Sequence, residues 1–144
     1  MGKILVIHGP NLNMLGVREP SIYGDWSFER LKEAIYEKGR ELGLEVDQFQ
    51  SNHEGELVEA IQGAMGRYSC IVMNPGAYTH TSVAIRDAVL AAGVPVIEVH
   101  ISNIHSREPF RRHSYLSDVA RGIICGLGPK GYLLALDAAR EIGT

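Results

Sequence analysis

Short apolar runs alternate with longer segments of helical spacing along the whole sequence, and this alternation limits the possible folds more than any other feature. The runs have the length and composition of strands and occupy residues 3–8, 44–49, 70–74, 94–99 and 120–125. Apolar residues at helical spacing follow Ser27 and end near Gly43, which predicts a helix between an N-cap serine and a terminal glycine. The same spacing predicts three further helices, over the segment marked by Leu57, Ile61 and Met65 and over residues 83–92 and 131–142.

Strands that are apolar throughout and alternate with helices are typical of a parallel sheet with both faces covered. Five such strands in 144 residues fit a flavodoxin-like three-layer sandwich better than a larger barrel. The length suits one domain, and no linker, internal repeat or low-complexity tract divides the sequence. The sequence therefore predicts one α/β domain over residues 1–144, with a five-stranded parallel sheet and helices on both faces.

Charge and composition exclude several classes of partner. Lys and Arg number 14 against 17 Asp and Glu, a net charge of −3, so no strong field favours nucleic acid. No apolar run approaches the roughly 18 residues that span a bilayer, and the first residues lack the pattern of a secretory signal. Cys70 and Cys125 lie within apolar runs, which indicates buried, reduced thiols. These features predict a soluble cytoplasmic protein that has neither a nucleic acid nor a membrane as partner.

Two long connections and several polar residues point to one ligand site. Residues 9–26 and 101–118 are far longer than the roughly two to six residues usual in α/β units, and such loops tend to be functional. Asn11 follows the first predicted strand and Asn74 ends the third, while Glu98 and His100 end the fourth. Open parallel sheets bind ligands at the carboxyl ends of their strands. We therefore expect these side chains to converge at that edge.

The sequence disfavours a nucleotide cofactor, a metal and a Schiff base. Gly126, Gly128 and Gly131 have the spacing of a dinucleotide-binding loop, but such a loop opens the first βαβ unit and has an acidic ribose ligand about 20 residues later. Here the glycines follow the last strand and the sequence stops at Thr144, so a turn is the better interpretation. His100 and His105 are five residues apart, unlike paired metal ligands on a helix or strand. No lysine falls at the ligand edge to act as an imine nucleophile; the lysines are Lys3, Lys32, Lys38 and Lys130.

Two basic segments are open to more than one interpretation. Tyr23 follows Arg18 in the first long connection; a tyrosine there is usually a packing residue, but an adjacent arginine favours the phenolate. Lowering a tyrosine pKa from about 10 to about 7 takes roughly 4 kcal/mol, which an arginine supplies only where the site is partly desolvated. The basic cluster of Arg107, Arg111, Arg112 and His113 suits either a solvated surface or a small anionic substrate.

Motifs over nearly the whole sequence resemble those of one known family. They are residues 4–16, Arg18-Glu-Pro, Tyr23-Gly, residues 50–56, 74–82, 85–87 and 96–105, Arg107-Glu, Phe110-Arg111, Ser114-Tyr115, Gly131-Tyr132 and residues 134–136. In these motifs the sequence resembles the type II 3-dehydroquinate dehydratases, or type II dehydroquinases. Met14 and Met73 stand where other aliphatic residues are common in that family, which leaves the chemistry untouched.

The resemblance implies dehydration of 3-dehydroquinate to 3-dehydroshikimate, the third step of the shikimate pathway, through an enolate and without metal, cofactor or Schiff base. It implies that Tyr23, as its phenolate, removes the proton beside the substrate ketone and that Arg18 favours this phenolate. Asn11 would help to position a water on the enolate oxygen. His100 would protonate the departing hydroxyl, with Glu98 fixing the orientation of its ring.

The same resemblance implies substrate contacts and an assembly. The substrate hydroxyls and carboxylate would be held by Asn74, His80, Arg111 and the backbone at Ile101 and Ser102. Asp87 would contribute from a neighbouring subunit, so that the site is complete only in an oligomer. For the family this oligomer is a homododecamer, a tetramer of trimers with closed symmetry.

From the residues alone, a second class of function stays open: a non-catalytic flavodoxin-like module that binds a small anion such as a sugar phosphate or a nucleotide. Such a module needs the basic loop, but it needs neither the pair of Arg18 and Tyr23 nor the pair of Glu98 and His100. Incubation with dehydroquinate separates the two functions, because only the enzyme produces a conjugated enone chromophore.

Overall fold

A five-stranded parallel sheet forms the centre of the structure, a computed structural model that describes residues 2–17 and 26–142. The strand order is β2-β1-β3-β4-β5, and every neighbouring pair is parallel. The strands are β1 (Lys3–His8), β2 (Glu45–Gln50), β3 (Cys70–Asn74), β4 (Val96–His100) and β5 (Gly122–Cys125). All five strands predicted from the sequence are present, each within two residues of its expected bounds.

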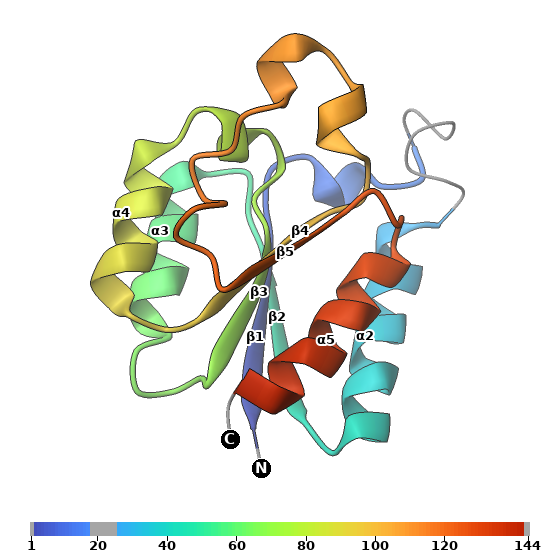
Figure 1. The fold of residues 1–144 in the computed structure, drawn as a ribbon. Coiled ribbons are helices and arrows are strands. Elements are labelled where there is room, and N and C mark those ends of the chain that lie inside the picture. The colour runs from blue at the N-terminus through green and yellow to red at the C-terminus, as the bar shows by residue number, and fades with distance from the viewer. Residues whose placement is uncertain (1, 18–25, 143–144) are drawn as a thin grey trace.

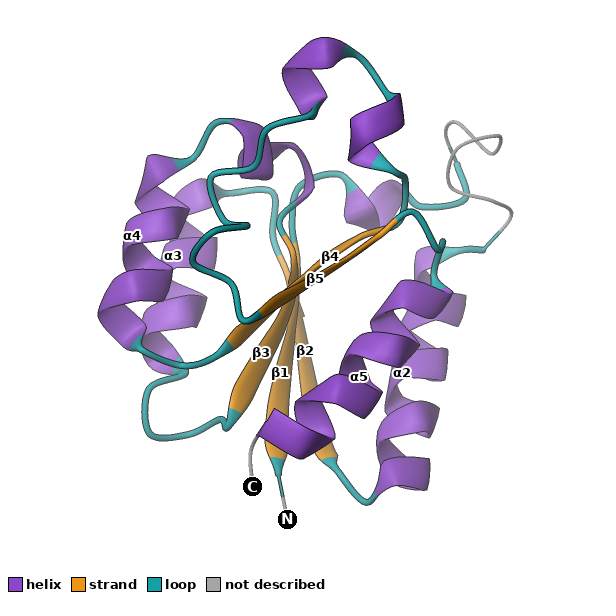
Figure 2. Cartoon of the chain, viewed as in Figure 1, coloured by secondary structure: helices purple, strands orange, loops and turns teal. Residues whose placement is uncertain are grey.

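Two pairs of helices cover the two faces of the sheet (Figures 1 and 2). Helices α2 (Phe28–Leu42) and α5 (Lys130–Ile142) lie on one face, and α3 (Glu54–Gly63) and α4 (Val83–Ala92) lie on the other. Successive residues of a strand point to opposite faces, so Ile4 joins the apolar cluster under α2 and α5 while Leu5 joins the cluster under α3 and α4. The predicted flavodoxin-like sandwich is confirmed.

Helix α2 begins and ends where the sequence predicts. The Ser27 Oγ atom accepts the Arg30 N–H at 3.1 Å, and Gly43 ends the helix in the left-handed conformation with φ 71°. Leu31 and Ile35, on the side of this helix that faces the sheet, are fully buried. The apolar spacing therefore marks its core face.

Helix α3 is shorter than predicted, and the expectation that Met65 lies on its buried face is wrong. The helix ends at Gly63, and Gly66 turns the chain with φ 73°. Leu57 and Ile61 are buried as expected, whereas Met65 is 55% exposed. The chain leaves the helix axis before Met65, so helical spacing no longer directs that side chain to the core.

Burial on both faces is complete in the central strands and incomplete at the edges of the sheet. Strands β1, β3 and β4 are buried almost throughout, whereas β2 and β5 are partly exposed. Cys70 in β3 is buried as expected, but Cys125 in β5 is only partly buried because β5 is an edge strand. Both cysteines are free thiols.

Short 3-10 helices, which the sequence analysis did not predict, shape the loops at the carboxyl ends of the strands. These are η1 (Leu12–Met14) after β1, η2 (Gly76–His80) after β3, and η3 (Ile104–Ser106) and η4 (Pro109–Arg111) after β4. The last two stand above the sheet, in orange in Figure 1. Among the described residues, no helix is long and apolar enough to cross a membrane.

The glycine-rich segment after β5 is a turn. Gly126 and Gly128 both have positive φ, at 88° and 69°, and α5 begins directly afterwards at Lys130. The interpretation of these glycines as a turn before a helix is confirmed.

Candidate active site

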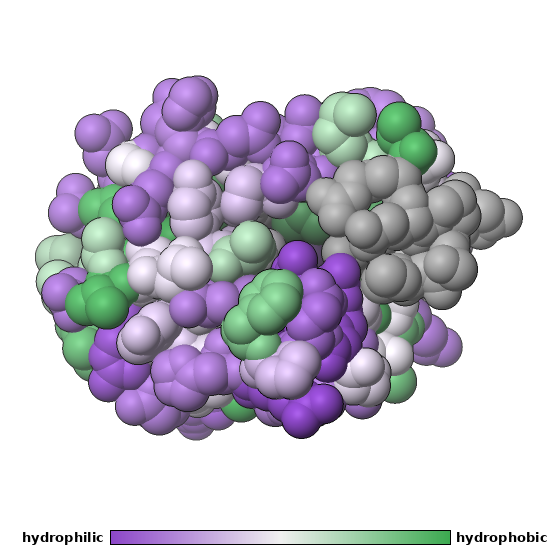
Figure 3. Space-filling view, turned by 90° about the horizontal axis from the view of Figure 1, so that it is seen from above, coloured by the Kyte–Doolittle hydropathy of each residue, from purple (hydrophilic) through white to green (hydrophobic). Residues whose placement is uncertain are grey.

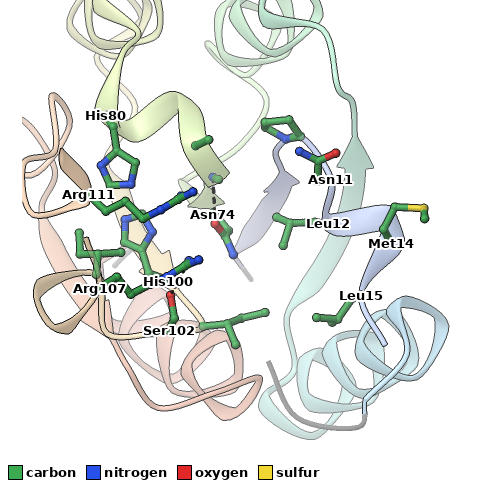
Figure 4. Close-up of a pocket in the computed structure, with 15 residues that line it drawn as sticks. Asn11, Leu12, Met14, Leu15, Asn74, His80, His100, Ser102, Arg107 and Arg111 are labelled. Atoms are coloured by element: carbon green, nitrogen blue, oxygen red, sulfur yellow. Dashed lines mark hydrogen bonds between the residues drawn. The ribbon is translucent and has the colours of Figure 1, made fainter. Parts of the chain in front are cut away.

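A pocket of about 140 Å³ opens where β1, β3 and β4 end, at the edge where the sequence predicts a ligand. This volume is roughly ten times what one water molecule needs, so the pocket has room for a small organic molecule. Figure 3 looks down on this edge and shows a largely hydrophilic surface. In Figure 4, side chains from the loops after all three strands face a common space.

Beside the pocket, the loops after β1 and β3 touch backbone to backbone. The Gly9 N–H donates to the Asn74 carbonyl oxygen at 2.7 Å. A Cβ atom on Gly9 would lie 2.6 Å from the Pro75 carbonyl group, and one on Gly76, which has φ 59°, would lie 3.1 Å from Pro10. Since a real Cβ has no room at Gly9, the close contact of these loops depends on glycine there.

Asn11 lies on the pocket wall and has a left-handed backbone, with φ 68°. Asparagine adopts this conformation more readily than most residues. Its N–H donates to Asn52 Oδ1 at 3.0 Å, and Gln50 Nε2 donates to the same oxygen at 3.1 Å. Gln50 also donates to the Gly9 carbonyl at 3.2 Å. The chain after β2 thereby fixes the backbone that presents Asn11 to the pocket.

His100 and Glu98 form a buried pair at the end of β4. The His100 Nε2 atom lies 2.5 Å from Glu98 Oε2, and the side chains are 5% and 0% exposed. A carboxylate only accepts hydrogen bonds, so Nε2 carries the hydrogen and Nδ1 is the ring nitrogen left for the pocket. His100 lines the pocket and Glu98 lies behind it.

Three hydroxyl groups surround the Glu98 carboxylate. Ser117 Oγ donates to Oε1 and Ser114 Oγ to Oε2, each at 2.8 Å, and Thr79 Oγ1 lies 3.1 Å from Oε2. Burial acts to raise the pKa of this carboxyl group, but the hydrogen bonds from His100, Ser117 and Ser114 outweigh burial and hold the pKa below its ordinary value. Glu98 therefore stays ionised and presents a negative charge to His100.

Two arginines make one side of the pocket basic. Arg111 Nε lies 3.2 Å from Glu108 Oε2, and Arg107 Nη1 lies 3.5 Å from Ser102 Oγ. Both arginines line the pocket (Figure 4). Guanidinium groups in such a position suit a carboxylate or another small anion.

His80, which also lines the pocket, is held in one tautomer. Its Nδ1 atom lies 2.8 Å from the His113 carbonyl oxygen, so Nδ1 donates and Nε2 is an acceptor. Burial lowers the pKa of His80, and the nearby His100 and Arg111 lower it further. The ring is therefore neutral near pH 7.

The structure brings most of the predicted site residues into one place. Those that line the pocket are Asn11, Asn74, His80, His100, Ile101, Ser102 and Arg111. Asp87 is exposed on α4 and does not line this pocket. Arg18 and Tyr23 lie outside the described residues.

Some residues that shape the site were not predicted from the sequence. Arg107 lines the pocket, and its place in the basic cluster with Arg111 was the available signal. The hydroxyls of Thr79, Ser114 and Ser117 reach Glu98 from separate loops, and no spacing in the sequence links them to it.

The described part of the chain holds no group of three His, Cys, Asp or Glu side chains arranged to bind a metal ion. All four lysines fall within the described residues, and none of them lines the pocket. The chemistry available to the described pocket residues is therefore proton transfer, hydrogen bonding and anion binding.

A family model described as dehydroquinase class II matches residues 2–140. The chain is 59% identical over 143 residues to the 3-dehydroquinate dehydratase of Methylococcus capsulatus, covering 99% of this chain and 97% of the relative. It is 56% identical over 137 residues to that of Vibrio parahaemolyticus, covering 95% and 92%. The solved type II dehydroquinase of Propionibacterium acnes superposes with a TM-score of 0.94 at 45% identity, covering 98% of this chain and 97% of that one.

Proposed function

This chain belongs to the dehydroquinase class II family, and from that membership we propose that its pocket removes water from 3-dehydroquinate to give 3-dehydroshikimate. The activity is that of a hydro-lyase in the shikimate pathway, at its third step. The observation that carries the proposal is the position of His100, bound to an ionised and buried Glu98, beside two arginines in one pocket (Figure 4). An acid beside an anion-binding wall suits a carboxylate substrate that loses a hydroxyl group.

His100 is the general acid of the elimination. When its ring carries both protons, Nδ1–H donates to the departing hydroxyl while Nε2–H stays bound to Glu98. The Glu98 carboxylate is the counter-charge of that imidazolium, and both side chains are buried. Proton transfer from Nδ1 releases water and returns His100 to the neutral form.

The base is Tyr23, and Arg18 is the group that favours its phenolate. The phenolate takes the proton from the carbon next to the ketone, and the electron pair moves onto the ketone oxygen as an enolate. The enolate then expels the hydroxyl that His100 protonates, so one water leaves and the enone forms. Asn11 helps to hold a water against the enolate oxygen. Support for Tyr23 and Arg18 comes from their family motifs, since both lie outside the described residues.

The remaining pocket residues bind the substrate. Asn74 and His80 contact its hydroxyls, and Arg111 with the backbone of Ile101 and Ser102 holds its carboxylate. His80 Nε2 is an acceptor, which matches a substrate hydroxyl that donates. The reaction proceeds without metal, cofactor or imine, in the cytoplasm.

The working form is an oligomer in which Asp87 reaches the pocket of a neighbouring subunit. Asp87 is exposed on α4 and absent from the pocket of its own chain, which agrees with a role toward a second copy. The assembly is a homododecamer built as a tetramer of trimers, and each catalytic unit is a single domain over residues 1–144.

The test is turnover of dehydroquinate, followed by the absorbance of the enone product. Tyr23→Phe removes only the ionisable hydroxyl and should lower turnover by at least about a thousandfold. Tyr36→Phe is the matched control, because Tyr36 is exposed on α2 and away from the pocket. A wild-type protein that binds the substrate but forms no enone would instead support a non-catalytic module for small anions.

A further inference from the structure

Two polar residues at the end of β2 and in the loop that follows it, Gln50 and Asn52, have no role in the mechanism above. Both fall in the motif of residues 50–56. Asn52 is exposed and does not line the pocket, yet its side chain contacts the loop after β1, which forms one pocket wall. An amide in this position can act on the pocket only through the residues that it holds.

The orientation of the Asn52 carboxamide is fixed by its neighbours. Two N–H donors meet at Asn52 Oδ1: the Asn11 backbone N–H at 3.0 Å and Gln50 Nε2 at 3.1 Å. Only an oxygen accepts from both, so the amide oxygen faces the loop after β1. Gln50 Nε2 also donates to the Gly9 carbonyl at 3.2 Å. Gln50 therefore connects Asn52 to the start of that loop.

The backbone around Asn52 is held on two further sides. The Tyr78 hydroxyl, on η2, donates to the Asn52 carbonyl oxygen at 2.8 Å. The preceding residue, Ser51, donates its N–H to the His8 carbonyl at 3.1 Å, where β1 ends. These bonds fix Asn52 to the sheet and to the loop after β3, so its side-chain oxygen has a defined position beside Asn11.

Asn11 needs such support because its backbone conformation is unfavourable. Among the described residues, Asn11 is the one residue other than glycine with a positive φ, at 68°. Asparagine tolerates the left-handed region better than most residues, but it stays there only when the surrounding structure holds it. The bond from its N–H to Asn52 stabilises this conformation. In the same conformation Asn11 lines the pocket (Figure 4).

We propose that Asn52 is a positioning residue, which holds Asn11 in the left-handed conformation so that the Asn11 carboxamide keeps its water at the enolate oxygen. This rests on the proposed function, because the water and the enolate belong to that reaction. Charge develops on the enolate oxygen only as the reaction proceeds, so a well-placed water stabilises the transition state more than the bound substrate. Loss of the Asn52 oxygen therefore lowers kcat more than it raises KM.

The first experiment compares two substitutions that each turn an amide into a carboxylate. Asn52→Asp keeps an acceptor for both N–H donors. Gln50→Glu removes the donor, so the Asn52 amide turns its nitrogen to the new carboxylate and the Asn11 N–H loses its acceptor. Each substitution adds one negative charge to the same cluster, which makes them matched for charge. We expect Gln50→Glu to lower kcat about tenfold, with Asn52→Asp at least about fivefold above it. Equal kcat values in the two variants overturn the proposal.

The second experiment is a double-mutant cycle with Asn11. Asn52→Ala should lower kcat about tenfold and change KM by less than about twofold. In an Asn11→Ala background the same substitution should change kcat by less than about twofold, because its effect passes through Asn11. A loss carried by KM instead of kcat, or an equal loss in both backgrounds, overturns the proposal. His53→Ala is the control, since His53 is the adjacent exposed residue and lies outside the pocket.

A third measurement does not depend on turnover. Hydrogen–deuterium exchange followed by mass spectrometry reports on residues 9–17 of the protein without substrate. Asn52→Ala should speed exchange in this loop by about threefold or more, whereas Asn52→Asp should leave it slower than in Asn52→Ala. Unchanged exchange in Asn52→Ala overturns the proposal even where kcat falls.

The outcomes separate the positioning role from the proposed function. Normal wild-type turnover together with near-normal kcat in Asn52→Ala and Gln50→Glu overturns the role of Asn52 and leaves the function intact. A wild type that neither binds dehydroquinate in calorimetry nor converts it overturns both proposals.

Discussion

The ring of His100 is bound through Nε2 to a Glu98 carboxylate that has no exposed surface, at a distance of 2.5 Å. A buried carboxylate is stable only when hydrogen bonds or charges compensate its lost hydration. Here the compensation comes from His100 and from hydroxyl groups of neighbouring loops. The arrangement fixes the direction of the ring and leaves Nδ1 toward the pocket.

Replacement of Glu98 by glutamine removes the charge and keeps the shape. We expect Glu98→Gln to lower kcat by about a hundredfold, since the imidazolium then has no counter-charge. Ser117→Ala, which removes one hydrogen bond but keeps the carboxylate, should have a smaller effect. Steady-state kinetics of both variants check this; a Glu98→Gln enzyme within threefold of wild type would contradict the role of the charge.

The neutral, buried His8 makes stability depend on pH. The unfolded chain protonates this histidine near pH 6.5, whereas the folded chain keeps it neutral down to about pH 4. Between these values unfolding takes up a proton, so stability falls as the pH falls, by about 3 kcal/mol for the full shift. Urea unfolding of wild type and of His8→Asn from pH 7 to pH 4 measures this contribution. Parallel losses in the two proteins would show that His8 does not supply it.

Gly9 and Gly55 offer a matched pair of glycine substitutions. Gly9→Ala places a methyl group against the Pro75 backbone and should lower the free energy of unfolding by about 2 kcal/mol. In Gly55→Ala the methyl group meets nothing within 4 Å, at an exposed position in the first turn of α3, and stability should stay equal or rise by about 0.5 kcal/mol. Thermal unfolding distinguishes the two, and a harmless Gly9→Ala would refute the close contact of the loops.

Arg111 should contribute to substrate binding more than its neighbour Arg112. Arg111 lines the pocket, whereas Arg112 is exposed and outside it. A hydrogen bond to a charged group contributes about 1.5–3 kcal/mol, so Arg111→Ala should raise KM by roughly tenfold or more. Arg112→Ala should leave KM within about twofold. Equal effects of both substitutions would point to a general field rather than a direct contact.

Shared sites in the proposed oligomer predict complementation between inactive variants. Asp87→Ala and Tyr23→Phe should each be inactive alone. After mixed unfolding and reassembly at equal amounts, about one quarter of the sites should combine an intact Tyr23 with an intact Asp87 of a neighbour. Recovery of activity in the mixture is the measurement, with each variant reassembled alone as the control. No recovery in correctly sized oligomers would place Asp87 outside the site.

The order of strands and helices was predictable because burial imposes periodicity on local sequence. Leu31, Ile35, Leu57 and Ile61 are apolar at helical spacing and fully buried. Met65 is an exception, because the apolar spacing continues past Gly63, where the helix has ended. A positive φ at Gly66 decides where the chain turns, and periodicity carries no information on that.

Contacts between distant loops could not be predicted from the sequence. Asn74 and His100 were expected at the ligand edge because both end strands of a parallel sheet. The hydroxyls of Ser114 and Ser117 meet Glu98 only through the path of the loop after η4, which includes no repeating pattern. Likewise, the pairing of His8 with Tyr132 joins residues 124 positions apart.

The backbone contact between Gly9 and Pro75 limits how the substrate specificity of the enzyme can be changed. A side chain at Gly9 would push the loop after β1 away from the loop after β3, and the ends of these two strands would move apart with them. The stretch from Ile101 to Arg111 faces the same space and is built from short 3-10 helices and loop, outside the sheet. Variants that accept a substrate with a larger ring should therefore be sought first by substitutions between Ile101 and Arg111, with Gly9 left unchanged.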